Sequence, residues 1–157
     1  RAKVVFICSR NAARSQMAEG FLRAFYGGTY EVSSAGLRPF RVSRTAIRVM
    51  GETGIDISSQ RSKAVGELAG ERFDLMITLC DEAACTPRAL LPRARRCISR
   101  VFPDPAASGG SEEEILAAFR RVRDGIGSWI REEFAPGRDP GAPDRTPRST
   151  GPDLQKT

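Results

Sequence analysis

The chain has 157 residues, 40% of them hydrophobic and 28% charged, with a net charge of +6, which fits about one globular domain. Histidine is absent, which excludes Ser-His-Asp and Cys-His catalysis and histidine-ligated metal sites, so we expect neither a metal nor another cofactor. The longest apolar run, VVFIC at residues 4–8, is too short to span a bilayer and follows no signal peptide, so we expect a cytoplasmic protein without a membrane partner.

Short apolar strands alternate with helical patterns along most of the chain. The pattern predicts strands at 3–7, 30–34, 73–79 and 97–102, and a helix at 14–25. Ser43 can cap a second helix, and Ser111 with Glu114 forms a capping box before a third. This alternation predicts an α/β fold, a three-layer αβα sandwich around a four-stranded parallel sheet.

The composition changes at Pro136. Residues 136–157 hold five of the ten prolines and only one large apolar residue, Leu154. Such a segment cannot bury a core, so we predict a folded domain at 1–135 followed by a disordered tail at 136–157.

Three reactive residues are predicted to meet at one edge of the sheet. The first strand ends at Cys8, the third just before Cys80, and the fourth just before Asp104. Ligands of parallel sheets bind beyond the carboxyl ends of the strands, so this edge is the candidate site.

The loop CSRNAARS at residues 8–15 carries the main candidate chemistry. Its backbone N–H groups, at a helix N-terminus, can form a nest for a tetrahedral oxyanion, and Arg14 can add a bidentate fork. The same field is predicted to lower the pKa of Cys8 and make it a nucleophile. Asn11 suits a left-handed turn, and Ser15 can donate a hydrogen bond to the thiolate. The predicted oxyanion-binding residues are Ser9, Arg10, Asn11, Ala12, Ala13, Arg14 and Ser15. The alternative is a buried cysteine with Arg14 on the surface.

Two further features have competing interpretations. Asp104 lies between prolines and is either a general acid for a leaving oxygen or an ordinary turn residue. Cys80 and Cys85 are a structural pair, half of a zinc site or a redox pair. Zinc is disfavoured without histidine or a second nearby pair, and proximity to Cys8 favours redox chemistry. Cys97, in the predicted fourth strand, is expected to be a small core residue.

The chain resembles the low-molecular-weight tyrosine phosphatase superfamily and, within it, the thioredoxin-coupled arsenate reductases. The resemblance covers nearly all of residues 3–134. Its motifs are the loop CSRNAARS, RSQMAEGF at 14–21, SSAG at 33–36, GIDIS at 54–58, TLCDEAAC at 78–85, DPAA at 104–107 and FRRVRDGI at 119–126.

This resemblance implies a relay of three cysteines. Cys8 attacks arsenate held by the loop and Arg14, while Asp104 assists departure of a hydroxyl. Cys80 then attacks Cys8 and releases arsenite, and Cys85 attacks Cys80. Thioredoxin reduces the resulting disulfide; glutaredoxin or a low-molecular-weight thiol is the alternative reductant.

The chain departs from the family pattern in the loop and in the cysteine pair. Only four residues separate Cys80 from Cys85, fewer than in many relatives, so disulfide formation is expected to need a larger rearrangement. Arg10 stands where a small residue is common, and we expect it to tune the oxyanion field or the choice of partner.

A third departure concerns a cation site. Some relatives hold a structural potassium ion with residues that match Asn11, Glu19 and Ser34. Lys63 occupies the remaining carboxylate position here. We predict that its ammonium group replaces the cation and pairs with Glu19.

Three functions remain open. The first is an arsenate reductase, and the second is a low-molecular-weight tyrosine phosphatase with a Cys8 phosphocysteine intermediate. The third is a non-enzymatic binding module, either an oxyanion sensor or a redox-regulated partner of a transcription factor. A requirement for Cys80 and Cys85 distinguishes the first two, and tolerance of Asp104 loss would indicate the third. Aromatic residues make up only 7% and do not interleave with basic residues, so no nucleic-acid partner is expected. The arginines at 88–100 are interpreted as a solvated face, or else a docking face for an acidic partner. We expect a monomer.

Overall fold

The computed structural model describes residues 1–143. Its strands pair in parallel in the order β2-β1-β3-β4, and they are β1 (Ala2–Cys8), β2 (Tyr30–Gly36), β3 (Arg72–Thr78) and β4 (Arg93–Ser99). The α-helices are α1 (Arg14–Tyr26), α2 (Arg44–Gly51), α3 (Asp81–Ala84) and α4 (Glu112–Glu133). Short 3-10 helices are η1 (Val65–Leu68), η2 (Arg88–Leu90) and η3 (Pro105–Ser108). The predicted α/β fold with a four-stranded parallel sheet is confirmed.

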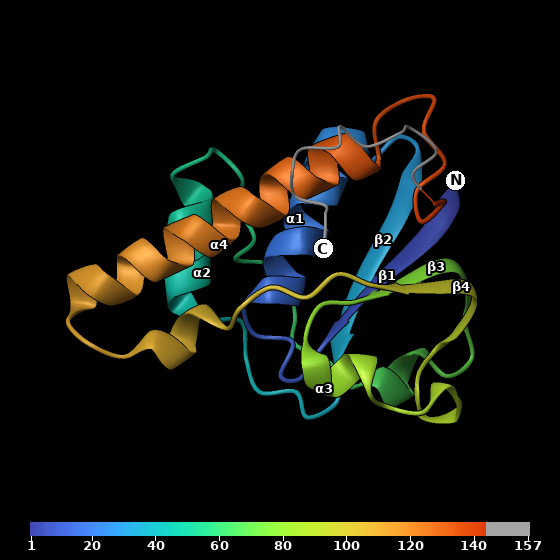
Figure 1. The fold of residues 1–157 in the computed structure, drawn as a ribbon, viewed down its shortest axis with the longest axis horizontal. Helices are drawn as coiled ribbons and strands as arrows, with labels where there is room; N and C mark the ends of the chain where they lie inside the picture. The colour runs from blue at the N-terminus through green and yellow to red at the C-terminus, as the bar shows by residue number, and fades with distance from the viewer. Residues whose placement is uncertain (144–157) are drawn as a thin grey trace, which may run out of the picture.

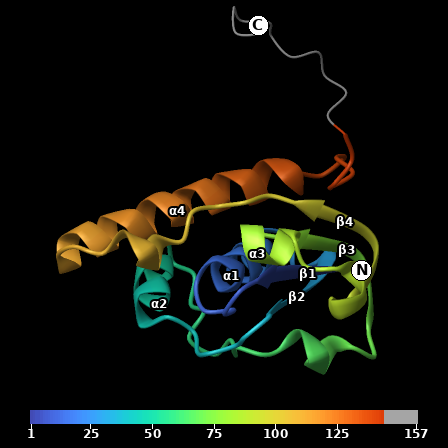
Figure 2. The same cartoon turned by 60° about the horizontal axis from the view of Figure 1, so that its bottom comes forward.

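Both faces of the sheet are covered. Val4 and Phe6 of β1 face a core shared with α1, α2 and α4, whereas Val5 and Ile7 face a second core shared with η1, α3 and η2. Successive strand residues point to opposite faces, which explains the continuous apolar run of β1. Figure 1 shows α4 crossing α1 and α2, and Figure 2 shows the same helices after rotation. These layers are the predicted αβα sandwich.

The predicted helix starts are also confirmed. The Ser43 hydroxyl accepts a hydrogen bond from the Ala46 amide at 3.1 Å at the start of α2. Ser111 and Glu114 form the reciprocal capping box of α4. Within residues 1–143, no helix combines the length and apolarity needed to cross a membrane.

The fourth strand lies earlier than predicted. It spans Arg93–Ser99 instead of 97–102, because it is an edge strand rich in arginine and lacks an apolar run in its first half. Arg95 lies 3.7 Å from Asp74 of β3, and its side chain is exposed, consistent with a solvated face. As a result Asp104 does not follow a strand directly.

Part of the predicted tail makes defined contacts. The Arg96 guanidinium donates to the Asp139 carboxylate and to the Pro140 carbonyl, and the Gly141 amide donates to Glu133 of α4. Residues 136–143 therefore pack against β4 and the end of α4, because charged side chains there supply partners. The rest of the predicted tail, 144–157, lies outside the described residues.

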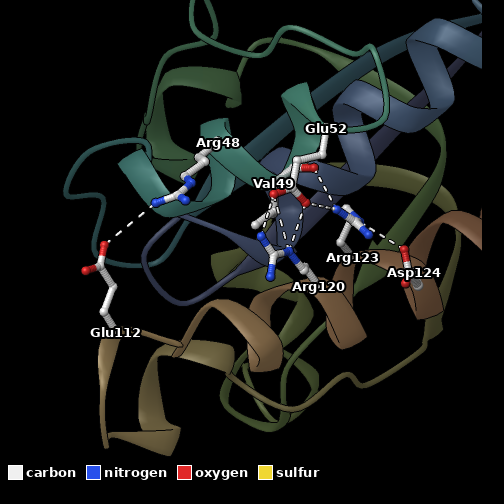
Figure 3. Close-up of polar contacts among 7 residues, drawn as sticks. All are labelled: Arg48, Val49, Glu52, Glu112, Arg120, Arg123 and Asp124. Carbon is white, nitrogen blue, oxygen red and sulfur yellow. Dashed lines mark hydrogen bonds and ion pairs between the residues drawn. The ribbon is translucent and has the colours of Figure 1, made fainter. Parts of the chain in front are cut away.

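A network of ion pairs joins α2 to α4 (Figure 3). Glu52, at the C-terminus of α2, accepts hydrogen bonds from Arg120 and from Arg123, each with a shortest distance of 2.7 Å. Arg123 also donates to the Val49 carbonyl at 2.9 Å. These arginines, Arg120 first, hold the pKa of Glu52 well below its usual range, at about 2.

We expect Glu52→Gln to lower the melting temperature at neutral pH, and the difference from the parent protein to shrink in acid. Because the pKa of Glu52 is depressed on folding, its stabilisation is present above the unfolded pKa near 4.5 and is lost as the pH falls toward about 2. Thermal unfolding across this range measures the effect. Glu112→Gln is the control, since Glu112 lies 3.7 Å from Arg48 and is far more exposed. A gap independent of pH would contradict this prediction.

Candidate functional site

The loop between β1 and α1 is fixed by buried hydrogen bonds around Asn11. The backbone φ of Asn11 is 52°, which is the predicted left-handed conformation. Its side-chain amide donates to Ser15 at 2.8 Å and to Ser34 of β2 at 2.9 Å, and its side-chain oxygen accepts from the Lys63 amide at 3.0 Å. Asn11 therefore holds the loop to three other segments of the chain.

Gly36 allows β2 to approach this loop. It pairs with Cys8 in the sheet, and a Cβ atom there would lie 2.8 Å from the Asn11 amide nitrogen and 2.9 Å from the Arg10 carbonyl carbon. Those atoms belong to the backbone and cannot move without changing the loop, so only glycine fits. This contact gives the SSAG segment its structural role.

The loop lines a cavity of about 470 Å³ that brings together three predicted site residues, Cys8, Arg14 and Asp104. Other predicted loop residues that line it are Ser9, Arg10, Ala12 and Ala13. The Arg14 guanidinium donates to the Phe102 carbonyl at 3.1 Å and lies 4.0 Å from the Asp104 carboxylate. An oxyanion in this cavity would meet the loop, a fixed guanidinium and a carboxyl group.

Asn11 and Ser15 support the loop from inside the protein. Both side chains are fully buried, and neither lines the cavity. The Ser15 hydroxyl accepts from the Asn11 side-chain amide at 2.8 Å. Among residues 1–143 it makes no hydrogen bond with Cys8, so the predicted contact is not formed in this structure.

Asp104 is both a turn residue and a cavity residue. It caps η3, where one carboxylate oxygen accepts from the Ala106 amide at 2.9 Å. The other oxygen is the one nearest Arg14, and the side chain is about half exposed. Its two oxygens therefore serve separate partners, and the group is open to a ligand.

Cys80 lies against Cys8 at the N-terminus of α3. Its sulfur is 3.3 Å from the Ser9 hydroxyl and accepts from the Ala83 amide at 3.4 Å. The neighbouring Cys8 thiol, together with these contacts, lowers the pKa of Cys80 to about 5. The proximity of Cys80 and burial raise the pKa of the Cys8 thiol. These directions oppose the predicted lowering of the Cys8 pKa and favour Cys80, beside Ser9 and the Ala83 amide, as the ionised member of the pair.

Cys85 stands at the other end of the same helical turn. It is exposed, whereas Cys80 is buried, and both are free thiols. Five residues of α-helix rise about 7.5 Å, which exceeds the usual Cα separation across a disulfide. A bond between Cys80 and Cys85 therefore requires α3 to unwind. Cys97 is a further free thiol and packs, partly buried, at the margin of the second core.

The cation beside Glu19 is Arg23, so the predicted pairing with Lys63 is wrong. One oxygen of the buried Glu19 carboxylate accepts from the Ser34 hydroxyl at 2.6 Å, and the other accepts from the Arg23 guanidinium at 2.5 Å. Arg23 follows Glu19 by one helical turn, which places the two side chains on one face of α1. Lys63 instead contributes its backbone to Asn11 and Gly36.

Both oxygens of the Glu19 carboxylate therefore have partners in the chain, Ser34 and Arg23. In the part of the chain that the structure describes, no group of three or more potential metal-ligating side chains is found.

Sequence reasoning missed Arg38 and Glu82. Arg38 lines the cavity and forms an ion pair with Glu82 of α3. Arg38 follows the end of β2 by two residues, so the rule that ligands bind beyond parallel strands would have found it. No local signal marks its partner, which is 44 residues away in sequence.

The family model for low molecular weight phosphotyrosine protein phosphatases matches residues 3–134, and the chain belongs to this family. Proteins named arsenate reductase from Halalkalibacterium halodurans and Bacillus subtilis are 41% and 40% identical to it. Each alignment covers 82% of this chain, and 91% and 92% of the respective relative.

Solved structures agree with this assignment. An arsenate reductase in its phosphate-binding state superposes with a TM-score of 0.73 at 34% identity, covering 86% of this chain and 98% of that one. A low molecular weight protein tyrosine phosphatase from T. tengcongensis superposes with a TM-score of 0.71 at 25% identity, covering 85% and 98%. Both classes share the fold, and the sequence is more similar to the first.

The charge on Cys80 predicts a thiolate absorbance in the ultraviolet that rises around pH 5. Cys80→Ser should remove this step. Cys8→Ala should move it toward higher pH, because Cys8 is the largest stabiliser of the thiolate. Cys97→Ser is the control and should keep the step. A step that survives Cys80→Ser and disappears in Cys8→Ala would place the thiolate on Cys8 instead.

Arg23→Gln is expected to destabilise the protein by about 1–3 kcal/mol, because it removes a charged hydrogen-bond partner from a buried carboxylate. Chemical denaturation measures this loss of stability, with Arg121→Gln as a control on the exposed side of α4.

The parent protein should show equal stability and activity in potassium and sodium salts of equal ionic strength. Clear activation of the parent protein by potassium would contradict the assignment of Arg23 as the resident cation.

Proposed function

We propose that the protein is an arsenate reductase that uses Cys8, Cys80 and Cys85 in turn, with thioredoxin as the external reductant. The observation that carries the proposal is the placement of a second buried cysteine, Cys80, in the same buried cluster as the cavity cysteine Cys8. A third free thiol, at the far end of the same helical turn, and the relatives named arsenate reductase support it.

In the first step the loop and Arg14 hold arsenate, and Cys8 attacks arsenic. A sulfur–arsenic bond forms and an arsenic–oxygen bond breaks. The Cys8 proton and the departing hydroxyl leave together as water, with Asp104 as the carboxyl group that assists proton delivery. No electrons pass to arsenic in this step.

In the second step the Cys80 thiolate attacks the sulfur of Cys8. A Cys8–Cys80 disulfide forms, the sulfur–arsenic bond breaks, and its electron pair stays on arsenic. As(V) thereby becomes As(III) and leaves as arsenite. The low pKa of Cys80 suits this role, because the attacking group is already ionised at neutral pH.

In the third step Cys85 attacks Cys80, which restores the Cys8 thiol and leaves a Cys80–Cys85 disulfide. Cys85 loses its proton, and α3 unwinds to bring the two sulfurs together. An external dithiol then returns two electrons and two protons. The exposure of Cys85 provides access for a protein reductant, and the free thiols suit a reducing compartment such as the cytoplasm.

A phosphatase reaction at the same cavity would require Cys8, Arg14 and Asp104 but not the other two cysteines. The placement of Cys80 against Cys8 has no use in that reaction, and it therefore favours the reductase.

The test is NADPH consumption by the full chain with arsenate, thioredoxin and thioredoxin reductase. We expect oxidation that depends on arsenate and that Cys8→Ser abolishes. Cys85→Ser should release about one arsenite per chain and then stop, because the disulfide cannot leave Cys8. Cys97→Ser is the matched control and should turn over normally.

Repeated turnover by Cys85→Ser would refute the relay. If arsenate caused no NADPH oxidation with thioredoxin but caused it with glutaredoxin and a thiol, glutaredoxin would replace thioredoxin as the proposed reductant. The cysteine relay itself would still be supported. Failure with both, combined with hydrolysis of an aryl phosphate that survives Cys80→Ser, would establish the phosphatase.

A further inference from the structure

Glu82 ties α3 to the oxyanion cavity. Its carboxylate accepts two hydrogen bonds from the Arg38 guanidinium, one of them at 2.7 Å, and one from the Ser9 hydroxyl at 2.8 Å. Within residues 1–143, these are the only polar contacts that the side chains of α3 residues Asp81–Ala84 make with segments distant in sequence. Glu82 is therefore the polar anchor of the helix that separates the two relay cysteines.

The two partners of Glu82 also line the oxyanion cavity. Arg38 and Ser9 belong to the same cavity lining as Cys8 and Arg14. Arg38 therefore has two possible anionic partners, the Glu82 carboxylate and an oxyanion in the loop. The side chains of Arg38 and Glu82 are 64% and 44% exposed, and ion pairs this exposed to water are weak. A multiply charged oxyanion beside Arg38 can compete with a single carboxylate.

Loss of the anchor would leave α3 poorly supported. The helix is a single turn held by the Ala84 and Cys85 amides, which donate to the Cys80 and Asp81 carbonyls at 3.0 and 2.9 Å. One helical turn is not stable in isolation. Beyond its backbone, the buried Ala83 and the buried Cys80 at its N-terminus then keep α3 on the sheet.

We propose that Arg38 binds the substrate oxyanion in exchange for Glu82, and that this exchange releases α3. Arg38 is then a substrate-binding residue, and Glu82 is a positioning residue that keeps Cys80 and Cys85 apart until substrate is bound. The second half rests on the proposed function, because only the cysteine relay needs α3 to unwind. The first half needs only the binding of an oxyanion.

The proposed order of events explains what the ion pair between Arg38 and Glu82 would do. Without substrate, Glu82 holds α3 folded, and Cys80 is separated from Cys85 by a full turn. This prevents the two thiols from forming a disulfide before Cys8 has reacted. With oxyanion bound, the turn is free to open, so that Cys85 can reach Cys80 once arsenite has left.

Hydrogen–deuterium exchange of the reduced full-length protein tests whether Arg38 leaves Glu82 when an oxyanion binds. The probe is inorganic phosphate, which binds without redox chemistry. Saturation is monitored by the protection of Cys8 from alkylation. We expect phosphate to accelerate exchange of the Ala84 and Cys85 amides by about two- to fivefold, the range for loss of an exposed ion pair. Glu82→Gln keeps an acceptor for Ser9 and should show the faster exchange without phosphate.

Glu67→Gln is the matched control. The ion pair of Glu67 with Arg61 has similar exposure, 46% and 66%, and lies outside the cavity. This variant should exchange like the parent protein and respond to phosphate in the same way.

Unchanged or slower α3 exchange with bound phosphate would overturn the proposal. So would parental exchange in Glu82→Gln, or a lack of phosphate protection of Cys8. Failure of the relay gives a different result: α3 would still open with phosphate, but arsenate would produce no Cys80–Cys85 disulfide.

Discussion

The parallel pairing of β1 with β3 is the constraint on which the site depends. Ile7 lies opposite Thr78 in the register, and the Leu79 amide donates to the Ile7 carbonyl at 2.9 Å. The ends of β1 and β3 are therefore held at the same edge of the sheet. Cys8 follows Ile7 directly and Cys80 follows Thr78 by two residues, so both cysteines leave the sheet at this edge. The pairing of the strands thus brings the two cysteines to one edge, and the turns that follow the strands place their sulfurs.

The site combines a rigid part with a marginal part. Asn11, Ser34 and Gly36 fix the oxyanion loop through buried hydrogen bonds and close backbone contact. By contrast, α3 is one turn long and depends on an exposed ion pair. A rigid loop suits precise placement of a tetrahedral ion. A weak helix suits a segment whose two ends have to meet, because only low-stability elements open at small cost.

Much of this arrangement was predictable from the sequence because its signals are local. The buried strands, the left-handed Asn11 and the helix caps at Ser43 and Ser111 each follow from short patterns of residue types. The strand-end rule then brought Cys8 and Cys80 to one edge of the sheet. The pairing of Arg23 with Glu19 could also have been predicted, because Arg23 follows Glu19 by four residues on a predicted helix.

Other features depend on contacts that no local pattern encodes. The first half of β4 is an edge strand of arginines, so it lacks the apolar run that marks the other strands. The lowering of the Cys80 pKa depends on Cys8, Ser9 and the Ala83 amide, which meet only in the folded chain. The pairing of Arg38 with Glu82 is of the same kind.

The lack of histidine has a consequence for how the site responds to its surroundings. Histidine is the side chain whose ordinary pKa lies between pH 5 and 8, and the chain contains none. The side chains that line the cavity therefore include no imidazole that could gain a proton as the medium becomes mildly acidic. A dependence of oxyanion binding on pH near neutrality is then expected to report the ionisation of the oxyanion itself.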